Sequence, residues 1–140
     1  MAFLGRESSK VLIVEDNPDR NKWFKKLTNK IQSSHCIVTD QVSEAIDALK
    51  KEDWDIIFLD HDLKEDHYKV IGSTDPGPGT GADITGWLQN NPDNNRQALI
   101  IVHSLNPTGA WKMMHQLKDR KPVQIPFTIL QYLGDLSHAD

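Results

Sequence analysis

The sequence predicts an α/β fold in which helices cover both faces of a doubly wound, five-stranded parallel β-sheet. Strand and helix patterns alternate along all 140 residues, without an internal repeat or a Pro-rich or Ser-rich linker. The main strands are continuous apolar runs, which is typical of strands buried on both faces. Polar side chains follow directly where these runs stop. We expect one domain spanning residues 1–140, a length sufficient for one hydrophobic core.

The elements follow from local periodicity, taken in chain order. Apolar runs predict five strands, at 11–14, 35–39, 56–59, 98–102 and, more weakly, 122–127. Helical spacing predicts helices between them, at 18–31, 43–52, 82–90 and 106–119, with a last helix that contains Ile129, Leu130 and Leu133. The segment 64–81 contains four Gly and two Pro, so we expect a long mobile loop that lies over the strand ends.

Composition narrows the class of partner and the compartment. A formal net charge of -4 argues against a broad nucleic-acid-binding face, but it allows a small phosphate ester or the end of a nucleic acid as ligand. No run approaches the roughly 20 apolar residues of a membrane span. The single cysteine, Cys36, lies in an apolar run and is expected to be a buried thiol. We therefore expect a cytoplasmic protein without a membrane segment.

Polar residues stand at three strand ends, as Glu15-Asp16, Asp60-His61-Asp62 and His103-Ser104. In the flavodoxin-like (CheY-like) strand order 2-1-3-4-5, the first, third and fourth strands are neighbours about 4.8 Å apart. Ligands of such sheets bind outside the carboxyl ends of the strands. These side chains are therefore expected to converge on one pocket.

The residue types in this pocket suggest metal and acid-base chemistry. Glu15, Asp16 and Asp60 would bring three carboxylates together, and a divalent cation such as magnesium or manganese would neutralise them. The alternative is that they are solvated strand ends. His61 and His103 can supply a general base and a general acid near neutral pH, unless both are structural histidines.

These strand ends resemble the receiver domains of two-component response regulators. The acidic pair Glu15-Asp16 and the strand-terminal Asp60 carry the resemblance, which implies that Asp60 stands at the phosphoacceptor position. Two positions depart from the receiver pattern. His103 stands where receivers have Thr or Ser, and Ile125 replaces the Lys that precedes Pro-Phe and contacts the phosphoryl group.

Three motifs in order resemble the cyclic-phosphate processing receiver family more closely. They are LDHDL at 59–63, TGAD at 80–83 and HSLNPTGAWKM at 103–113. The resemblance implies a role in processing cyclic phosphates, including those at RNA ends. It also implies a set of functional positions, which are Asp16, Asp60, His61, Asp62, His103, Ser104 and Asn106.

Two further features leave alternatives open. The turn from Asn106 to Gly109 starts a helix whose amides could bind phosphate together with Ser104, or it is a plain helix cap. Asp62 could orient an imidazole or bind metal. The leading hypothesis is a metal-dependent phosphoesterase with His61, His103, Asp62 and Asp60 in catalysis; the alternative is a signalling receiver or pseudo-receiver. The four tryptophans are expected in the core or at its rim, namely Trp23, Trp54, Trp87 and Trp111.

Overall fold

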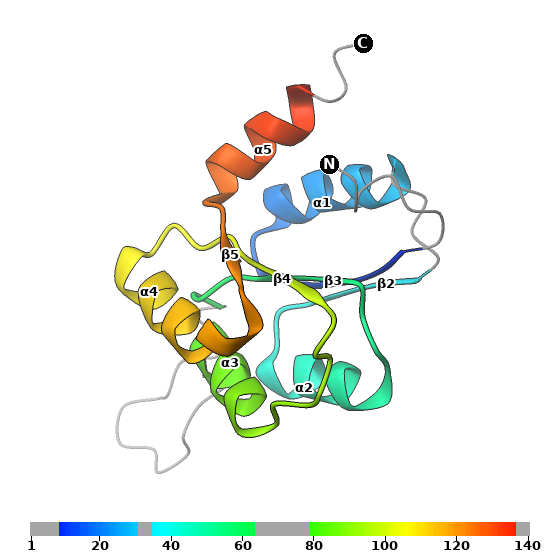
Figure 1. Ribbon diagram of the computed structural model, residues 1–140. Helices are drawn as coiled ribbons and strands as arrows, with labels where there is room; N and C mark the ends of the chain where they lie inside the picture. The colour runs from blue at the N-terminus through cyan, green and yellow to red at the C-terminus, as the bar shows by residue number, and fades with distance from the viewer. Residues whose placement is uncertain (1–8, 31–34, 64–78, 137–140) are drawn as a thin grey trace, which may run out of the picture.

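The computed structural model describes residues 9–30, 35–63 and 79–136, and it confirms the predicted sheet. All five strands are parallel, in the order β2-β1-β3-β4-β5 (Figure 1). They are β1 (Lys10–Val14), β2 (His35–Thr39), β3 (Ile56–Leu59), β4 (Leu99–Val102) and β5 (Val123–Gln124). The carboxyl ends of β1, β3 and β4 are therefore neighbours, as the strand order requires.

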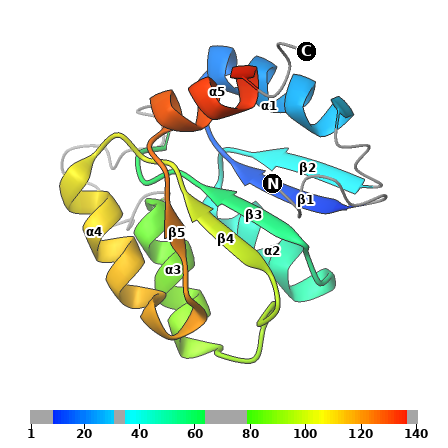
Figure 2. The same cartoon turned by 45° about the horizontal axis from the view of Figure 1, so that its top comes forward.

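Helices cover both faces of the sheet. The α-helices are α1 (Pro18–Lys30), α2 (Val42–Lys51), α3 (Gly81–Asn90), α4 (Pro107–Gln116) and α5 (Phe127–Leu136), and a short 3-10 helix spans Lys118–Arg120. Figures 1 and 2 show α1 and α5 on one face and α2, α3 and α4 on the other. None of the helices in the described part of the chain is long and apolar enough to cross a membrane.

The core lies in two layers because successive strand residues point to opposite faces. In β1, Val11 and Ile13 pack in the cluster under α1 and α5, whereas Leu12 and Val14 pack in the cluster under α2, α3 and α4. All four side chains are completely buried. The same alternation continues past the strand ends and decides to which layer each polar residue belongs.

The observed element boundaries differ from the predicted ones most at the fifth strand and the fourth helix, and by one residue at several others. The fifth strand ends at Gln124, because Pro126 has no N–H and Phe127 already begins α5. The fourth helix ends at Gln116, and the chain then tightens into the 3-10 helix up to a left-handed Lys121 at φ 55. Gly81 is the first residue of α3 and not part of the loop, while residues 64–78 of the predicted mobile loop lie outside the described residues.

One of the four tryptophans lies elsewhere than expected. Trp54 is buried and Trp23 and Trp87 are half-buried, but Trp111 is 67% exposed. In α4 the inward positions belong to Ala110 and Met113, so that Trp111 points outward and stacks on His115. Cys36 is half-buried in β2, and burial raises the pKa of its thiol.

Candidate functional site

A polar hollow of about 410 Å³ lies at the carboxyl ends of β1, β3 and β4. Its lining combines carboxylates, amides, one guanidinium and two leucines, from Asp16, Asn17, Arg20, Asp60, Asp62, Leu63, Leu105 and Asn106. Four of the sequence-predicted residues, Asp16, Asp60, Asp62 and Asn106, are thus brought together around one space. Glu15, His61, His103 and Ser104 lie beside or beneath it.

Strand alternation divides the site into two groups. Ile13, Phe58 and Ile101 pack under α1 and α5, so the residues two positions further on, Glu15, Asp60 and His103, continue on that side of the sheet. Leu59 packs in the opposite layer, and His61, two positions further on, packs against α4. The two histidines therefore leave the strand ends in different directions, and only His103 joins the buried acids.

The first group is a buried cluster of Glu15, Asp60 and His103, whose potential ligand atoms all lie within 4.8 Å of one another. Glu15 and His103 are completely buried, and Asp60 is 3% exposed. His103 Nε2 lies 3.0 Å from Glu15 Oε1. The carboxylate oxygens of this cluster are donors that suit a divalent metal such as manganese or magnesium.

The hydrogen bonds of His103 select one tautomer. Its Nδ1 is buried without a described partner, and the ring lies among the aromatic rings of Phe24, Phe58 and Phe127. A proton on Nδ1 would leave a buried donor unpaired, whereas a proton on Nε2 is donated to Glu15. Burial also lowers the pKa of His103. His103 is thus a neutral imidazole that donates to an ionised Glu15.

The two carboxyl groups of the cluster titrate in opposite directions. Burial opposes ionisation of Glu15, but the hydrogen bond from His103, together with the Asn17 amide and the charge of Arg20, outweighs it and lowers the pKa of Glu15 to about 2. Burial raises the pKa of Asp60 to about 8, and the negative charge of Glu15 adds to this effect. At neutral pH without metal, Asp60 therefore holds the one proton of the pair.

Arg20 is a member of the site that the sequence analysis missed. It lies in the first turn of α1, and its Nη1 is 3.4 Å from Glu15 Oε1 and 3.7 Å from Asp60 Oδ2. The only sequence signal is its position shortly after the acidic pair, in a turn that Asn17 fixes by accepting hydrogen bonds from the Asp19 and Arg20 amides. A basic residue in a helical first turn is ordinarily solvated, so composition alone did not single it out.

Asp16 lines the hollow but is not one of the three clustered residues. Its backbone N–H donates to Glu15 Oε2 at 2.9 Å. Partial burial raises the pKa of its carboxyl group, and the neighbouring Glu15 adds to the shift. The expected trio of Glu15, Asp16 and Asp60 is therefore present at one place, with Asp16 and Asp60 at the hollow and Glu15 behind them.

The second group joins His61, Asp62 and Asn106. His61 Nδ1 lies 2.8 Å from Asp62 Oδ1, and Asn106 Nδ2 donates to the same oxygen at 3.2 Å. Because the short contact requires a proton on Nδ1, the neutral ring carries its lone pair on Nε2. The His61 side chain is 17% exposed. A carboxylate that fixes a histidine tautomer in this way is the arrangement of a general base.

Two glycines of the sequence motifs allow helices to start against this segment. A Cβ on Gly81 would lie 1.9 Å from the Asp60 carbonyl oxygen, and one on Gly109 would lie 2.3 Å from His61 Cγ. Thr80 and Asp83 form a capping box at the start of α3. The TGAD motif and the glycine of the third motif thus hold the ends of α3 and α4 against the LDHDL segment.

The residues predicted to bind phosphate use part of their hydrogen-bonding capacity locally. Ser104 is 3% exposed, and its Oγ accepts from the Asn106 amide at 3.0 Å. Asn106 caps α4 by accepting from the Gly109 amide at 3.0 Å. Because that amide is engaged, we assign Gly109 the role of leaving room for the His61 ring in place of the suggested phosphate contact. Asn106 Nδ2 remains at the hollow.

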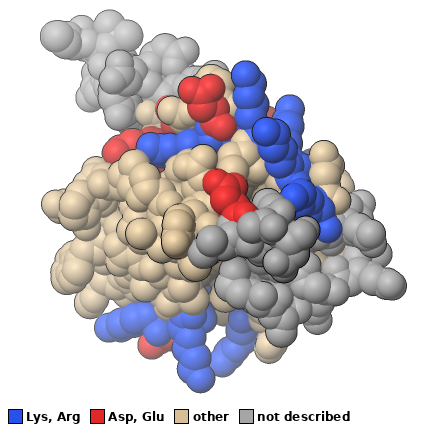
Figure 3. All heavy atoms as spheres, turned by 90° about the horizontal axis from the view of Figure 1, so that it is seen from above, with Lys and Arg blue, Asp and Glu red and all other residues tan. Residues whose placement is uncertain are grey.

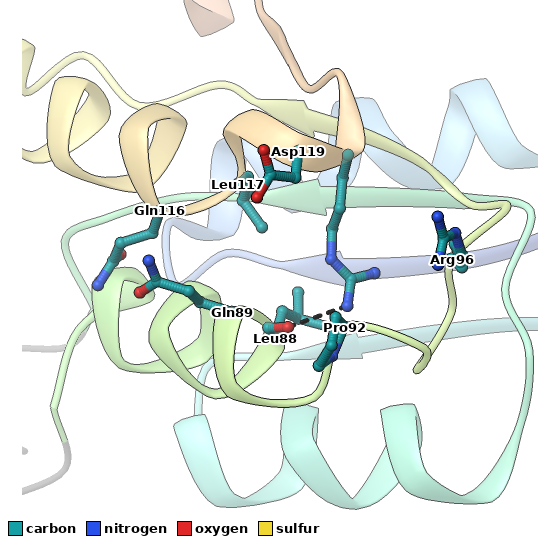
Figure 4. A pocket seen from close by; sticks show the side chains of 8 residues that line it. Leu88, Gln89, Pro92, Arg96, Gln116, Leu117 and Asp119 are labelled. Atoms are coloured by element: carbon teal, nitrogen blue, oxygen red, sulfur yellow. Dashed lines mark hydrogen bonds between the residues drawn. The ribbon is translucent and has the colours of Figure 1, made fainter.

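A second hollow, of about 100 Å³, lies at the opposite end of α3 (Figure 4). Arg120 reaches across it and donates to the carbonyl oxygens of Leu88, Asn91 and Asn94, at 3.0, 2.8 and 2.6 Å. The Leu88 and Asn91 carbonyls also accept from the Asn91 and Asn94 amides, so the guanidinium is an additional donor that ties the 3-10 helix to the end of α3 and the turn after it. The N–H donors of Arg120 are thus engaged by backbone carbonyls, and the described lining of this hollow has no group of acids and histidines like that of the first hollow.

Positive charge gathers on the face of the molecule that α1 and α5 form. Figure 3 shows Lys and Arg side chains along one side of this face. The α1 sequence contains one arginine and four lysines, and all four lysines are exposed, namely Lys22, Lys25, Lys26 and Lys30. The helix that contributes Arg20 to the hollow therefore has a local positive surface despite the net charge of -4.

Solved structures show that this fold is the receiver fold. The phosphorylated cyanobacterial phytochrome response regulator RcpA matches with a TM-score of 0.63 at 18% identity, over 95% of this chain and 97% of that one. The receiver domain of the histidine kinase CKI1 from Arabidopsis thaliana, solved in complex with Mg2+, matches with a TM-score of 0.62 at 15% identity, over 97% and 94%. A CheY-like receiver domain from Methylobacillus flagellatus has a TM-score of 0.59 at 13% identity, over 96% and 100%.

The sequence then places the chain within a particular group of receivers. The model of the cyclic-phosphate processing receiver domain matches residues 10–119, and the chain belongs to that family. No curated protein matches it in sequence. The matched range contains all three motifs that suggested the family, and all the candidate site residues.

Proposed function

We propose that this domain binds a divalent cation and a phosphate ester in the polar hollow and hydrolyses a cyclic or terminal phosphate. The observation that carries the proposal is the Asp62–His61 pair, at 2.8 Å, beside the cluster of Glu15, Asp60 and His103. A base with a fixed tautomer and a cation site adjoin one space of about 410 Å³. Family membership supports a cyclic phosphate as the substrate class.

The residues of the cluster fit a metal ion. Asp60 would be the central ligand, with Asp16 at the hollow and Glu15 behind, and His103 would hold Glu15 in place. A divalent cation bound there supplies positive charge to the phosphate oxygens and lowers the pKa of water. The Mg2+ complex of the CKI1 receiver domain, which has the same fold, supports the choice of a divalent cation.

His61 is the proposed general base. Asp62 accepts the Nδ1 proton, so Nε2 is free to take a proton from the attacking water. The water oxygen bonds to phosphorus, one P–O bond of the ester breaks, and the released oxygen takes up a proton, so that the net change is the addition of one water. Asn106 holds Asp62 and thereby the orientation of the ring.

His103 has a different role from the one that the sequence suggested. The sequence analysis assigned acid-base catalysis to His103 as well as to His61, but the His103 side chain has no exposed surface and its Nε2 is 3.0 Å from Glu15 Oε1. We therefore propose His103 as a positioning residue, which keeps Glu15 ionised and oriented beside Asp60. His61 and Asp62 are left as the acid-base pair.

The phosphate group of the proposed substrate is negatively charged, so basic side chains near the hollow would favour its binding. The exposed lysines of α1 follow Arg20 along the same helix, and their positive charge favours a phosphate at the end of a nucleic acid over a small phosphate ester. A small phosphate ester remains the second substrate to test. Leu105, which is 47% exposed at the hollow, offers an apolar contact for the remainder of either ligand.

A signalling receiver is the second candidate function, because Asp60 ends β3 in a receiver fold. Three observations weigh against it. Asp60 is 3% exposed, its pKa is raised to about 8, and Ile125 occupies the position of the receiver lysine. Acetyl phosphate is the test: stoichiometric phospho-Asp60 by mass spectrometry would favour signalling, and unmodified protein favours the phosphoesterase.

The phosphoesterase is tested with a panel of 2′,3′-cyclic, 3′,5′-cyclic and linear phosphates, with and without magnesium or manganese. We expect metal-dependent hydrolysis that His61→Gln slows by about 10²–10⁴-fold. His115→Gln is the matched control, because His115 is an exposed histidine of α4. Hydrolysis of none of these substrates by the wild type, or equal rates for His61→Gln and wild type, would reject the proposal.

A further inference from the structure

Arg20 reaches the site from α1, whereas the receiver lysine that Ile125 replaces here would reach it from the end of β5. Its backbone N–H is fixed by Asn17 Oδ1 at 3.1 Å, in the first turn of α1. The side chain passes over the ring of Phe127, with 5.2 Å from the guanidinium carbon to the ring centroid. Phe127 stands two residues after Ile125. The guanidinium therefore lies beside the segment that follows β5, where receivers have the lysine that Ile125 replaces in this chain.

The contacts of Arg20 with other described residues leave most of its hydrogen-bonding capacity unused. Both carboxylates are approached by the same nitrogen, Nη1, at 3.4 Å from Glu15 and 3.7 Å from Asp60. Paired Arg–carboxylate hydrogen bonds are ordinarily about 2.7–2.9 Å and involve two nitrogens. A guanidinium has five N–H donors. Arg20 thus balances the charge of the acids at some distance and keeps a fork of donors for an anion.

The charge of the hollow requires such a donor. Three carboxylates line it, from Asp16, Asp60 and Asp62, and Arg20 is the one basic side chain among the described lining residues. A phosphate would meet net repulsion there without a cation. Arg20 is also partly accessible, since 24% of its side chain is exposed.

We propose that Arg20 is the phosphate-binding residue of the hollow and replaces from α1 the cation that receivers supply from β5. The inference rests on the proposed function, because it concerns the phosphate group that the hollow binds. Without ligand, Arg20 balances the charge of Glu15 and Asp60. A divalent cation at these acids takes over that task, and the guanidinium then forms paired hydrogen bonds with the phosphate oxygens.

The proposal is tested by titrating the wild type, Arg20→Lys and Arg20→Gln with inorganic phosphate, with and without Mn2+, by calorimetry. We expect phosphate affinity to fall about 10–100-fold in Arg20→Gln, the value of a lost charged hydrogen-bond pair, and by less in Arg20→Lys. Lys22→Gln is the matched control, since Lys22 is an exposed cation one half-turn further along α1. Thermal unfolding confirms that each variant is folded.

The outcomes separate this inference from the proposed function. Phosphate binding by the wild type with unchanged affinity in Arg20→Gln overturns the role of Arg20 and leaves the proposed function standing. Equal loss in Lys22→Gln and Arg20→Gln also overturns it, because a general surface charge would then be responsible. A wild type that binds neither phosphate nor a cyclic phosphate in the presence of metal overturns the proposed function itself.

Discussion

His103 Nε2 lies 3.0 Å from Glu15 Oε1, and neither side chain has any exposed surface. This buried pair joins the end of β4 to the end of β1 across β3. It places an ionised carboxylate next to Asp60, and this charge adds to the effect of burial in raising the pKa of Asp60, which keeps its proton at neutral pH. The chemistry of the hollow therefore depends on a pair of residues that do not themselves reach it.

Metal binding should release a proton from Asp60. Because the pKa of this carboxyl is about 8 without metal, a cation must displace one proton below that pH. We expect the affinity for Mn2+ to rise by up to about tenfold per pH unit from pH 6 to pH 8 and then to level off. Calorimetry in two buffers of different ionisation enthalpy measures the released proton. An affinity independent of pH, or retained fully in Asp60→Asn, would contradict the expectation.

The same carboxyl should make the metal-free protein less stable as the pH rises. The pKa of Asp60 is raised in the folded state, so its contribution is complete at low pH and is lost between about pH 4 and pH 8, by at most about 1.4 kcal/mol per pH unit. Glu15, with its lowered pKa, contributes above its ordinary pKa and loses this contribution only toward pH 2.

Urea unfolding in the presence of a chelator checks this prediction. Wild type should lose stability from pH 5.5 to pH 8, and Asp60→Asn, which cannot ionise, should lose much less. If both proteins show the same pH dependence, the proton does not reside on Asp60.

Replacement of His103 should destabilise the fold. The ring of His103 is buried among Phe24, Phe58 and Phe127. His103→Ala would leave a cavity and remove the partner of a buried carboxylate. We expect a loss of about 3 kcal/mol in the free energy of unfolding. His115→Ala, at an exposed position, should change it little; equal effects would contradict the buried role.

A methyl group at Gly109 should displace His61. A Cβ there would lie 2.3 Å from His61 Cγ, so Gly109→Ala forces the ring away from Asp62. We expect shifted imidazole signals of His61 in NMR spectra and lower turnover of the cyclic phosphate. Gly86→Ala is the matched control, because its Cβ would meet only the end of the flexible Gln116 side chain, at 3.3 Å. Unchanged His61 signals in Gly109→Ala would refute the packing argument.

The sheet was predictable because its strands are short apolar runs with polar residues directly behind them. That pattern located Glu15, Asp60 and His103 at neighbouring strand ends without any structural information. Period-two alternation could also have shown that His103 shares the layer of Ile101, whereas His61 shares the layer of Leu59. Applied to the strand ends, it separates the two histidines that appeared equivalent.

Other features depend on contacts between distant segments. Arg20 acquires its role only when the first turn of α1 lies over the end of β1 and beside Phe127. The burial of His103 depends on rings from α1 and α5. Trp111 and Met113 are both apolar residues of α4, and only the packing of α4 on the sheet and α3 decides that Met113 points inward. No local pattern contains this information.

The hydrogen bond from the Gly81 amide to the His61 carbonyl, at 2.8 Å, closes the chain on itself directly beside the site. The polypeptide departs after one signature motif and returns within the next at a fixed point, whatever the number of residues between. The bonds that position His61 and Asp62 are therefore made within the signature motifs themselves, by described residues on both sides of positions 64–78.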